Sequence, residues 1–379
     1  MKKTTWIGVV VVILVIALLV LSQGSFNKNS ESVKIGAIYT LTGPIASYGE
    51  FQKQSAETAV KEINDAGGIN GKPVELFIED SASDAKKGVD ALNALKLRGV
   101  KFYIVEYSPV AVAVKSAIVN NGDFVMTAGA TAPTYVDGNN LSCRLTMTAA
   151  DIAPTLATYS ISNNQKKAAL LLPNNEYGKG LADEFTKKYT AAGGVITISE
   201  FYDPSGPSDF RTNITKIKAQ SADIDVLVTV NAANTVEPMF QQLKTLGWNK
   251  PILSDYNTIQ NPSLKDKNLI EKTVFVDWLY TPEPAEGDSQ MTKAFKEKYL
   301  ADHQSNPSLA AAGYYDAVKI TLDAIKKVGD DPKKVAEYIQ GLKNYPVITG
   351  NIVSFNSDCQ ATQTSTLRKV EAGKFVEIK

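Results

Sequence analysis

The chain has very few of the side chains on which most hydrolases and metalloenzymes depend. Among its 379 residues there is one histidine, His303, and there are two cysteines, Cys143 and Cys359. A zinc site needs three or four His, Cys or carboxylate ligands, and a Ser-His or Cys-His unit needs a histidine beside its nucleophile. His303 follows the apolar stripe of a predicted helix, where a solvated end residue is expected. We therefore predict neither an enzyme nor a metal site, and no cofactor.

An excess of charge of one sign is also missing. Forty Lys and Arg residues balance forty Asp and Glu residues, whereas proteins that bind nucleic acid normally carry a basic excess. Nucleic acid is therefore excluded as a partner. Hydrophobic residues make up 44% and charged residues 21% of the chain, which is typical of a globular protein. Single cores usually stop growing at about 250 to 300 residues, so a chain of this length predicts two lobes.

Long apolar runs are missing except at the N-terminus. Residues 7–21 carry no charge and follow Lys2 and Lys3, a positive flank that stays cytoplasmic. The run is short for a membrane span of about 20 residues, so a cleaved signal peptide and an uncleaved anchor both stay open. The anchor is favoured because no small-x-small cleavage site stands out. We expect residues 1–32 to export the chain and to tether it outside the cytoplasmic membrane, in the periplasm or on the outer membrane face.

Short β-rich runs alternate with amphipathic helical runs in the rest of the chain. One series starts with a strand at residues 33–39 and a helix at residues 51–66, and a second starts with a strand at 168–172 and a helix at 181–192. This alternation is typical of βαβ units around a parallel sheet.

The two series also share the motifs that flank their first helices. Tyr48-Gly49 precedes the first helix of one series and Tyr177-Gly178 that of the other, and Ala-Gly-Gly follows both helices, at 66–68 and 192–194. Equivalent motifs at a nearly constant offset predict an α/β fold with two doubly wound, Rossmann-like lobes.

The last third of the chain is expected to complete both lobes. A Pro-rich acidic connector at residues 281–288 is a place where the chain can cross between them. Further crossings are predicted near Arg144 and Thr364, which gives a three-segment hinge. The predicted division is residues 33–144 and 280–364 in the first lobe and residues 145–279 and 365–379 in the second.

Both cysteines lie just before predicted crossings. In an exported chain, where disulfides persist, this placement predicts a bond between Cys143 and Cys359. Free cysteines as buried apolar fillers are the alternative.

Ligands of open α/β sheets bind beyond the carboxyl ends of the strands. The loops at these positions are rich in Ser, Thr, Tyr, Asn and Gly. Ser108 precedes Pro109 at the start of a helical run, so it is predicted to cap a helix whose free N–H groups suit a small carboxylate. The structural alternative is that Ser108 caps its own helix and nothing more, and that Thr131 merely caps or turns the chain before Pro133.

Four motifs in order resemble the branched-chain amino-acid-binding proteins of ABC transporters, which are type 1 periplasmic binding proteins. The motifs are IGAIYTLTGPIASYGE at 35–50, INDAGGING at 63–71, GATAP at 129–133 and YGKG at 177–180. The resemblance covers roughly residues 33–379 and implies the two-lobed fold of that family.

The resemblance also implies ligand-binding residues. Ser108 and Thr131 match the residues that hold the ligand carboxylate, and Gly129 matches the one whose carbonyl accepts from the ligand ammonium. Asp255 is the candidate acid for the ammonium, with Tyr256 as the other occupant of that place. Aromatic residues that close over the ligand from opposite lobes match Tyr48 and Tyr177, and the remaining candidates are Tyr107, Ala130 and Asn231.

Three features depart from the family pattern. Asn231-Ala232-Ala233-Asn234 stands where a Tyr or similar group is common, which implies a wider or more polar pocket. Glu106-Tyr107 replaces a smaller turn, and Glu106 would repel a ligand carboxylate unless it points away. A lipid-attachment cysteine is missing near the anchor.

The expected function is that of a monomeric solute receptor, which captures an amino acid between two lobes and delivers it to the permease of an ABC transporter. Receptors for amides, urea or aromatic acids are alternatives, and so is a ligand-sensing ectodomain. The ectodomain is disfavoured because no second membrane span or output domain follows Lys379.

Overall fold

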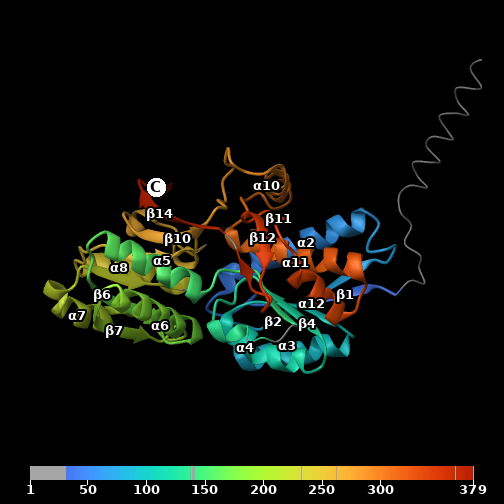
Figure 1. Cartoon of the computed structure of the whole chain (residues 1–379), viewed down its shortest axis with the longest axis horizontal. Helices are drawn as coiled ribbons and strands as arrows, with labels where there is room; N and C mark the ends of the chain where they lie inside the picture. Colours follow the sequence, from blue (N-terminus) through green and yellow to red (C-terminus); the bar gives the residue numbers. More distant parts are fainter. Residues whose placement is uncertain are drawn as a thin grey trace, which may run out of the picture.

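The computed structural model describes residues 31–136, 138, 141–231, 233–261, 263–362 and 364–378. Figure 1 shows two lobes side by side along the long axis of the molecule, each with helices packed around a central sheet. The predicted export segment at residues 7–21 lies outside the described residues. In the described part of the chain, no helix has the length and hydropathy that a membrane span requires.

The first lobe is built on a parallel sheet of five strands in the order β2-β1-β3-β4-β5. The strands are β1 (Val33–Tyr39), β2 (Val74–Asp80), β3 (Phe102–Val105), β4 (Phe124–Thr127) and β5 (Ser142–Arg144). Every residue of β3 and β4 is buried. Helices cover both faces of the sheet, and the strands are therefore continuous apolar runs without polar alternation.

Helices of the first lobe come from both ends of the chain. One face of its sheet packs on α2 (Ala46–Asp65), α11 (Leu309–Val328) and α12 (Pro332–Gln340), and the other on α3 (Ala85–Leu97) and α4 (Ser108–Val119). α10 (Gln290–His303) lies against α2. A small antiparallel sheet completes the lobe with β11 (Tyr345–Val347), β12 (Asn351–Phe355) and β13 (Ala361–Thr362).

The second lobe has a sheet of seven strands in the order β15-β14-β10-β9-β8-β6-β7. Its parallel strands are β6 (Lys167–Pro173), β7 (Val195–Tyr202), β8 (Val226–Thr229), β9 (Ile252–Asp255) and β10 (Val274–Trp278). β14 (Ser365–Glu371) pairs antiparallel with β10, and β15 (Lys374–Glu377) extends the sheet from β14. The C-terminal strands therefore belong to this lobe.

Helices cover both faces of the second sheet as well. α5 (Ala149–Ser162) and α6 (Glu176–Ala191) pack on one face, and α7 (Arg211–Ala219) and α8 (Val236–Thr245) on the other. The short helix α9 (Tyr256–Ile259) follows β9 directly. The prediction of an α/β fold with two Rossmann-like lobes is confirmed.

The predicted starts of two helices are wrong by more than one turn. α2 begins at Ala46 and α6 at Glu176, so Tyr48-Gly49 and Tyr177-Gly178 lie inside the first turns and not before them. The glycines are needed for close packing, because a Cβ on Gly49 would clash with the carbonyl of Thr40 and one on Gly178 with that of Pro173. The glycines that allow each helix to approach its strand closely therefore resemble, in sequence, the glycines of a turn before a helix.

The chain crosses between the lobes after β5, after β10 and before β14. A disulfide joins Cys143 in β5 to Cys359, and the N–H of Arg144 donates to the Cys359 carbonyl over 2.9 Å. The side-chain amide of Gln360 donates to the carbonyl of Thr146 over 3.0 Å. The first and third crossings are therefore fastened to each other.

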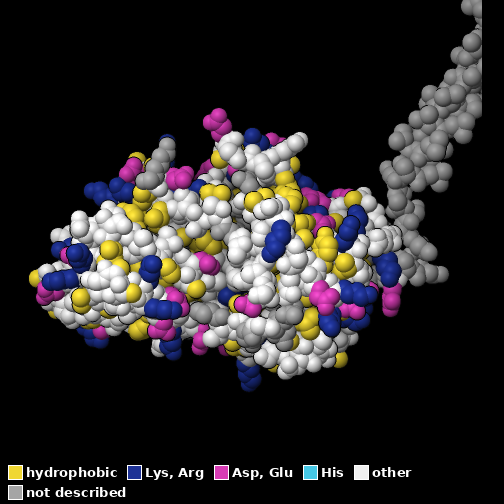
Figure 2. Space-filling view, in the orientation of Figure 1, with side chains coloured by type: hydrophobic (Ala, Val, Ile, Leu, Met, Phe, Trp, Pro, Cys, Tyr) yellow, Lys and Arg dark blue, Asp and Glu magenta, His cyan; other side chains and the backbone are white. Residues whose placement is uncertain are grey.

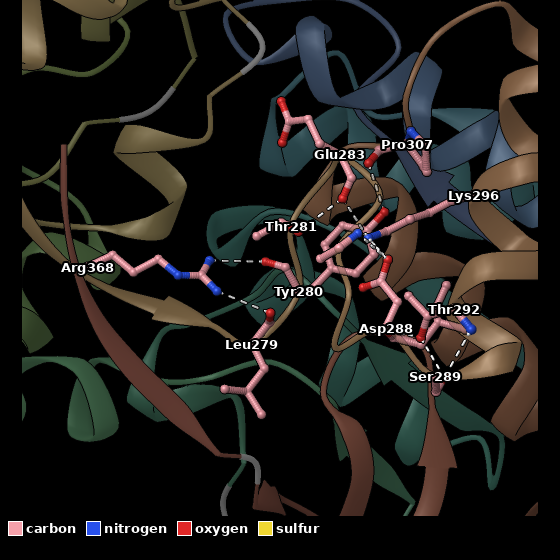
Figure 3. Close-up of polar contacts among 12 residues, drawn as sticks. Leu279, Tyr280, Thr281, Glu283, Asp288, Ser289, Thr292, Lys296, Pro307 and Arg368 are labelled. Atoms are coloured by element: carbon pink, nitrogen blue, oxygen red, sulfur yellow. Dashed lines mark hydrogen bonds and ion pairs between the residues drawn. The ribbon is translucent and has the colours of Figure 1, made fainter. Parts of the chain in front are cut away.

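The second crossing is held by Arg368 of β14. Figure 3 shows its guanidinium reaching the carbonyls of Leu279 and Tyr280, at 3.2 and 3.4 Å. The same guanidinium forms a 2.5 Å ion pair with the fully buried Asp277 at the end of β10. Arg368 therefore joins the third crossing to the second.

The acidic connector is fixed to the first lobe. Lys296 of α10 is buried and pairs with Asp288 over 2.7 Å, and it also donates to the carbonyl of Glu283 over 2.9 Å (Figure 3). Tyr280 donates its hydroxyl to the carbonyl of Pro307 over 2.9 Å. These contacts tie the chain to the first lobe immediately beyond the crossing.

The surface shows the charge balance that the composition predicts. On the face in Figure 2, Lys and Arg side chains are interspersed with Asp and Glu side chains over both lobes.

Candidate functional site

A cavity lies between the two lobes, beyond the carboxyl ends of the parallel strands. Its empty space, counted together with the opening to solvent, is about 930 Å³. The first lobe contributes Ile45, Tyr48, Gln52, Glu106, Tyr107, Ser108, Ala128, Gly129, Thr131, Leu309, Ala310, Gly313 and Tyr314. The second lobe contributes Pro173, Asn175, Tyr177, Asn231, Tyr256, Asn257, Gln260 and Trp278.

Ser108 and Thr131 lie together on the first-lobe wall. The prediction that Ser108 is the N-cap of α4 is wrong. Tyr107 occupies that position, and Ser108 is already helical. The Ser108 hydroxyl accepts instead from the backbone N–H groups of Thr131 and Ala132, at 3.1 and 3.2 Å. Ser108 therefore shapes the loop that presents Thr131 to the cavity.

The loop around Thr131 is fixed from several sides. The Thr127 hydroxyl accepts from the N–H groups of Gly129 and Ala130, at 3.2 and 3.0 Å. Arg144 of β5 donates to the carbonyl of Ala132 over 2.6 Å, and burial lowers the pKa of its guanidinium to about 10. Gly129 lines the cavity, whereas Ala130 is fully buried behind the wall. The loop is thus held in one conformation, with its N–H groups already bonded to the hydroxyls of Thr127 and Ser108.

Tyr48 joins the two lobes across the cavity. Its hydroxyl donates to the carbonyl of Asn257 over 2.8 Å and accepts from the side-chain amide of Asn261 over 2.7 Å. Tyr48 belongs to α2 in the first lobe, whereas both partners belong to the second. The structure is therefore a closed arrangement of the lobes.

Asp255 lies one layer behind the cavity wall. It is fully buried, and its carboxylate accepts from the N–H and hydroxyl of Thr258, at 2.9 and 2.6 Å, and from the hydroxyl of Tyr177. Burial is the main influence on Asp255 and raises its pKa. Tyr256 does line the cavity, and its hydroxyl bonds to that of Thr146 over 2.7 Å. The acid thus caps α9 and orients Tyr177.

Tyr107 and Asn231 complete the predicted set, and both line the cavity. Tyr107 has a φ of 63°, a left-handed conformation that is strained for a tyrosine. Burial raises its pKa to about 12. Asn231 follows β8 and is buried, and its backbone N–H donates to the hydroxyl of Thr258 over 2.7 Å.

The wall is mainly apolar and carries a small number of polar side chains. None of its described residues is a lysine or an arginine, so an anion there would meet uncharged donors. In the described ranges, no group of three His, Cys, Asp or Glu side chains is placed to hold a metal ion.

Residues 32–374 match the family model described as periplasmic binding protein. The chain belongs to the periplasmic binding proteins. This family consists of extracytoplasmic substrate-binding proteins and not of enzymes, which agrees with the expectation of a receptor.

Relatives of this periplasmic binding protein cover nearly its whole length. The Leu/Ile/Val-binding protein BraC3 of Rhizobium johnstonii is 30% identical over 91% of this chain and 93% of its own. A leucine-, isoleucine-, valine-, threonine- and alanine-binding protein of Pseudomonas aeruginosa is 26% identical over 89% of each chain. The branched-chain amino acid transporter protein LivJ of Streptococcus pneumoniae, solved with isoleucine, is 25% identical, covers 92% of this chain and 100% of its own, and has a TM-score of 0.81.

Sequence reasoning missed several wall residues of this periplasmic binding protein. Gln52 lies on α2 and Gln260 directly follows α9, and the sequence does not show which of their neighbours face the cavity. Asn257 lies two residues beyond Asp255 and lines the cavity. Glu106, which departs from the family pattern, lines the cavity although it is not among the predicted ligand residues. Its position directly after a buried strand was the signal that could have included it.

Proposed function

We propose that this periplasmic binding protein captures an amino acid in the cavity between its lobes and delivers it to the permease of an ABC importer. The observation that carries the proposal is the cavity between the lobes, which Thr131 lines and which Tyr48 spans by hydrogen bonds to the second lobe. The hydroxyls of Ser108 and Thr131 are uncharged donors for a carboxylate. The amino acids named for the relatives support this ligand class.

The individual roles are part of the same proposal. Ser108 and Thr131 bind the carboxylate, and the Gly129 carbonyl accepts from the ammonium. Asp255 acts through Tyr177, whose hydroxyl donates to it. Tyr48 closes the cavity.

Thr131→Val is expected to weaken amino-acid binding by about 1.5 to 3 kcal/mol, the range for a hydrogen bond to a charged group. Valine keeps the shape of the side chain and loses its hydroxyl, whereas Ser108→Ala would also leave two loop N–H groups unpaired. Isothermal titration of leucine into both proteins, after a thermal-shift screen of amino acids, amides and aromatic acids, measures the change.

Leucinamide provides the matched ligand, because it keeps the ammonium and lacks the carboxylate. It should bind the wild type far more weakly than leucine, and Thr131→Val should change its affinity little. Equal affinities of the wild type for leucine and leucinamide would contradict the proposed carboxylate site.

Ligand binding is expected to close the lobes, and Tyr48→Phe is expected to oppose closure. The variant loses two hydrogen bonds between the lobes, each worth about 0.5 to 1.5 kcal/mol. Affinity should fall by about tenfold, which corresponds to about 1.4 kcal/mol. Small-angle scattering should show that the radius of gyration of the wild type falls when ligand saturates it. The variant should need a higher ligand concentration for the same decrease.

Tyr103→Phe is the control, because the Tyr103 hydroxyl donates to the carbonyl of Val100 inside the first lobe. It should leave closure unchanged. A radius of gyration that stays constant when ligand saturates the wild type would refute capture by closure.

We also propose that residues 1–32 hold the protein at the outer face of the cytoplasmic membrane and that it acts as a monomer. The support is the uncharged run behind Lys2 and Lys3. The mass of the protein from membrane fractions shows whether the segment is retained, and sedimentation shows the oligomeric state.

A further inference from the structure

Glu106 is an acidic side chain on the wall of the proposed amino-acid site that the roles above leave unused. It follows β3, lines the cavity and is 6% exposed. Its carboxylate accepts from the hydroxyl of Thr40 over 2.9 Å. Among the ion pairs of the described residues, none involves Glu106. The carboxyl is therefore buried without a cationic partner from the described chain.

The surroundings of Glu106 favour a ligand that supplies the missing partner. Burial raises the pKa of Glu106 to about 7, against the opposing effect of hydrogen bonds from Thr40 and Gln52. Burial, with a smaller contribution from the charge of Glu106, raises the pKa values of four nearby tyrosines, Tyr39, Tyr48, Tyr107 and Tyr314. A donor or cation from the ligand would stabilise the ionised carboxylate, and the faces of the tyrosine rings attract cations.

Three residues with amide side chains lie in the wall of the same cavity. The side-chain oxygens of Gln52, Asn231 and Gln260 are buried and have no hydrogen-bond partner among the described residues. Gln52 extends from the first lobe, whereas Asn231 and Gln260 extend from the second. Donors from a ligand would satisfy these oxygens if the side chains turned toward the cavity.

The orientation of these amides follows from their partners. The nitrogen of Gln260 donates to the carboxylate of Asp277 over 2.6 Å, which leaves its oxygen free. The nitrogen of Asn231 donates to the hydroxyl of Thr229 over 3.2 Å, and that hydroxyl uses its proton on the carbonyl of Leu171. Exchanging nitrogen and oxygen in either amide would place two acceptors together.

An aliphatic ligand side chain would leave the Glu106 carboxyl without a partner. A buried acceptor that loses water and gains no donor is penalised, and sites built for a polar group strongly reject the analogue that lacks it. Leucine and isoleucine offer no donor beyond their ammonium group. The wall therefore suits a ligand with a second set of N–H donors.

We propose that the cavity selects amino acids whose side chains end in N–H donors, and that Glu106 determines this specificity by accepting from that group. The inference rests on the proposed function of an amino-acid receptor and names its ligand class. It departs from the aliphatic ligands named for the relatives.

Isothermal titration with matched amino acids tests this proposal. Ornithine and norleucine have side chains of equal length, one ending in an ammonium and the other in a methyl group, and glutamine and leucine extend the comparison. The better of ornithine and glutamine should bind the wild type about tenfold or more tightly than norleucine and leucine. Glu106→Leu should reverse this order, and Glu106→Gln should weaken ornithine more than glutamine.

Glu57→Gln is the matched control, because Glu57 is exposed on α2 and is not on the cavity wall. It should retain the preference of the wild type. Glu106→Gln keeps an acceptor for Thr40, and its melting temperature checks that loss of binding is not loss of fold.

The remaining outcomes separate the two proposals. Tighter binding of leucine than of ornithine and glutamine by the wild type would overturn the inference and leave the amino-acid receptor intact. An equal loss for leucine and ornithine in Glu106→Leu would also overturn it, because Glu106 would then hold the α-ammonium. Failure of the wild type to bind any of the four amino acids would reject the proposed function itself.

Discussion

Replacing both Cys143 and Cys359 by alanine is expected to lower the free energy of unfolding by about 4 to 5 kcal/mol. The cysteines are 216 residues apart in sequence, and a cross-link that closes so long a loop strongly restricts the unfolded chain. Urea unfolding of the oxidised wild type, the reduced wild type and the double variant measures the effect.

Reduced wild type should match the double variant, because both have lost the same restriction. Mass spectrometry of the non-reduced protein should find no alkylatable thiol. Two alkylatable thiols, or equal stability of the oxidised and reduced proteins, would contradict the disulfide.

Arg368→Met is expected to lower the free energy of unfolding by about 3 to 5 kcal/mol, the cost of leaving one partner of a buried ion pair behind. The partner is Asp277, which is fully buried in the sheet of the second lobe. Methionine retains most of the aliphatic volume of arginine. Guanidinium unfolding monitored by circular dichroism measures the loss.

The double variant Arg368→Met with Asp277→Leu should recover most of this loss, since no charge then remains buried. The deficit of Arg368→Met should also shrink as pH falls. Burial raises the pKa of Asp277 to about 6 even beside Arg368, which lowers it. Without Arg368, folded Asp277 should take up its proton at a higher pH than it does in the wild type, so the deficit should shrink as pH falls toward about 6 and stay constant below it. A deficit that does not change as pH falls toward 6 would show that Asp277 is not the stranded charge.

The sequence predicted the lobes better than it predicted the wall of the cavity. Repeated motifs around Tyr48 and Tyr177 indicated two equivalent lobes because chain topology leaves a periodic pattern. The same motifs misplaced two helix starts, since Gly49 and Gly178 serve packing against strand carbonyls.

The acidic candidate illustrates what a linear pattern does not contain. Asp255 does end β9 at the edge of the sheet where ligands bind. Whether its carboxylate faced the cavity depended on Thr258 and Tyr177, which supply donors from behind the wall. Gln260 follows the short helix α9 and lines the cavity, a placement that depends on how the two lobes meet and not on the local sequence.

The fastened crossings limit the ways in which the lobes can move. Three crossings that moved independently would allow the lobes to twist and slide against each other as well as to bend. The disulfide between Cys143 and Cys359 joins the first crossing to the third, and Arg368 joins the third crossing to the second. Three crossings that are joined in this way should act as one hinge with a single axis. We therefore expect the lobes to rotate as rigid bodies. A partner that touches both outer rims would then sense one angle and, through it, the occupancy of the cavity.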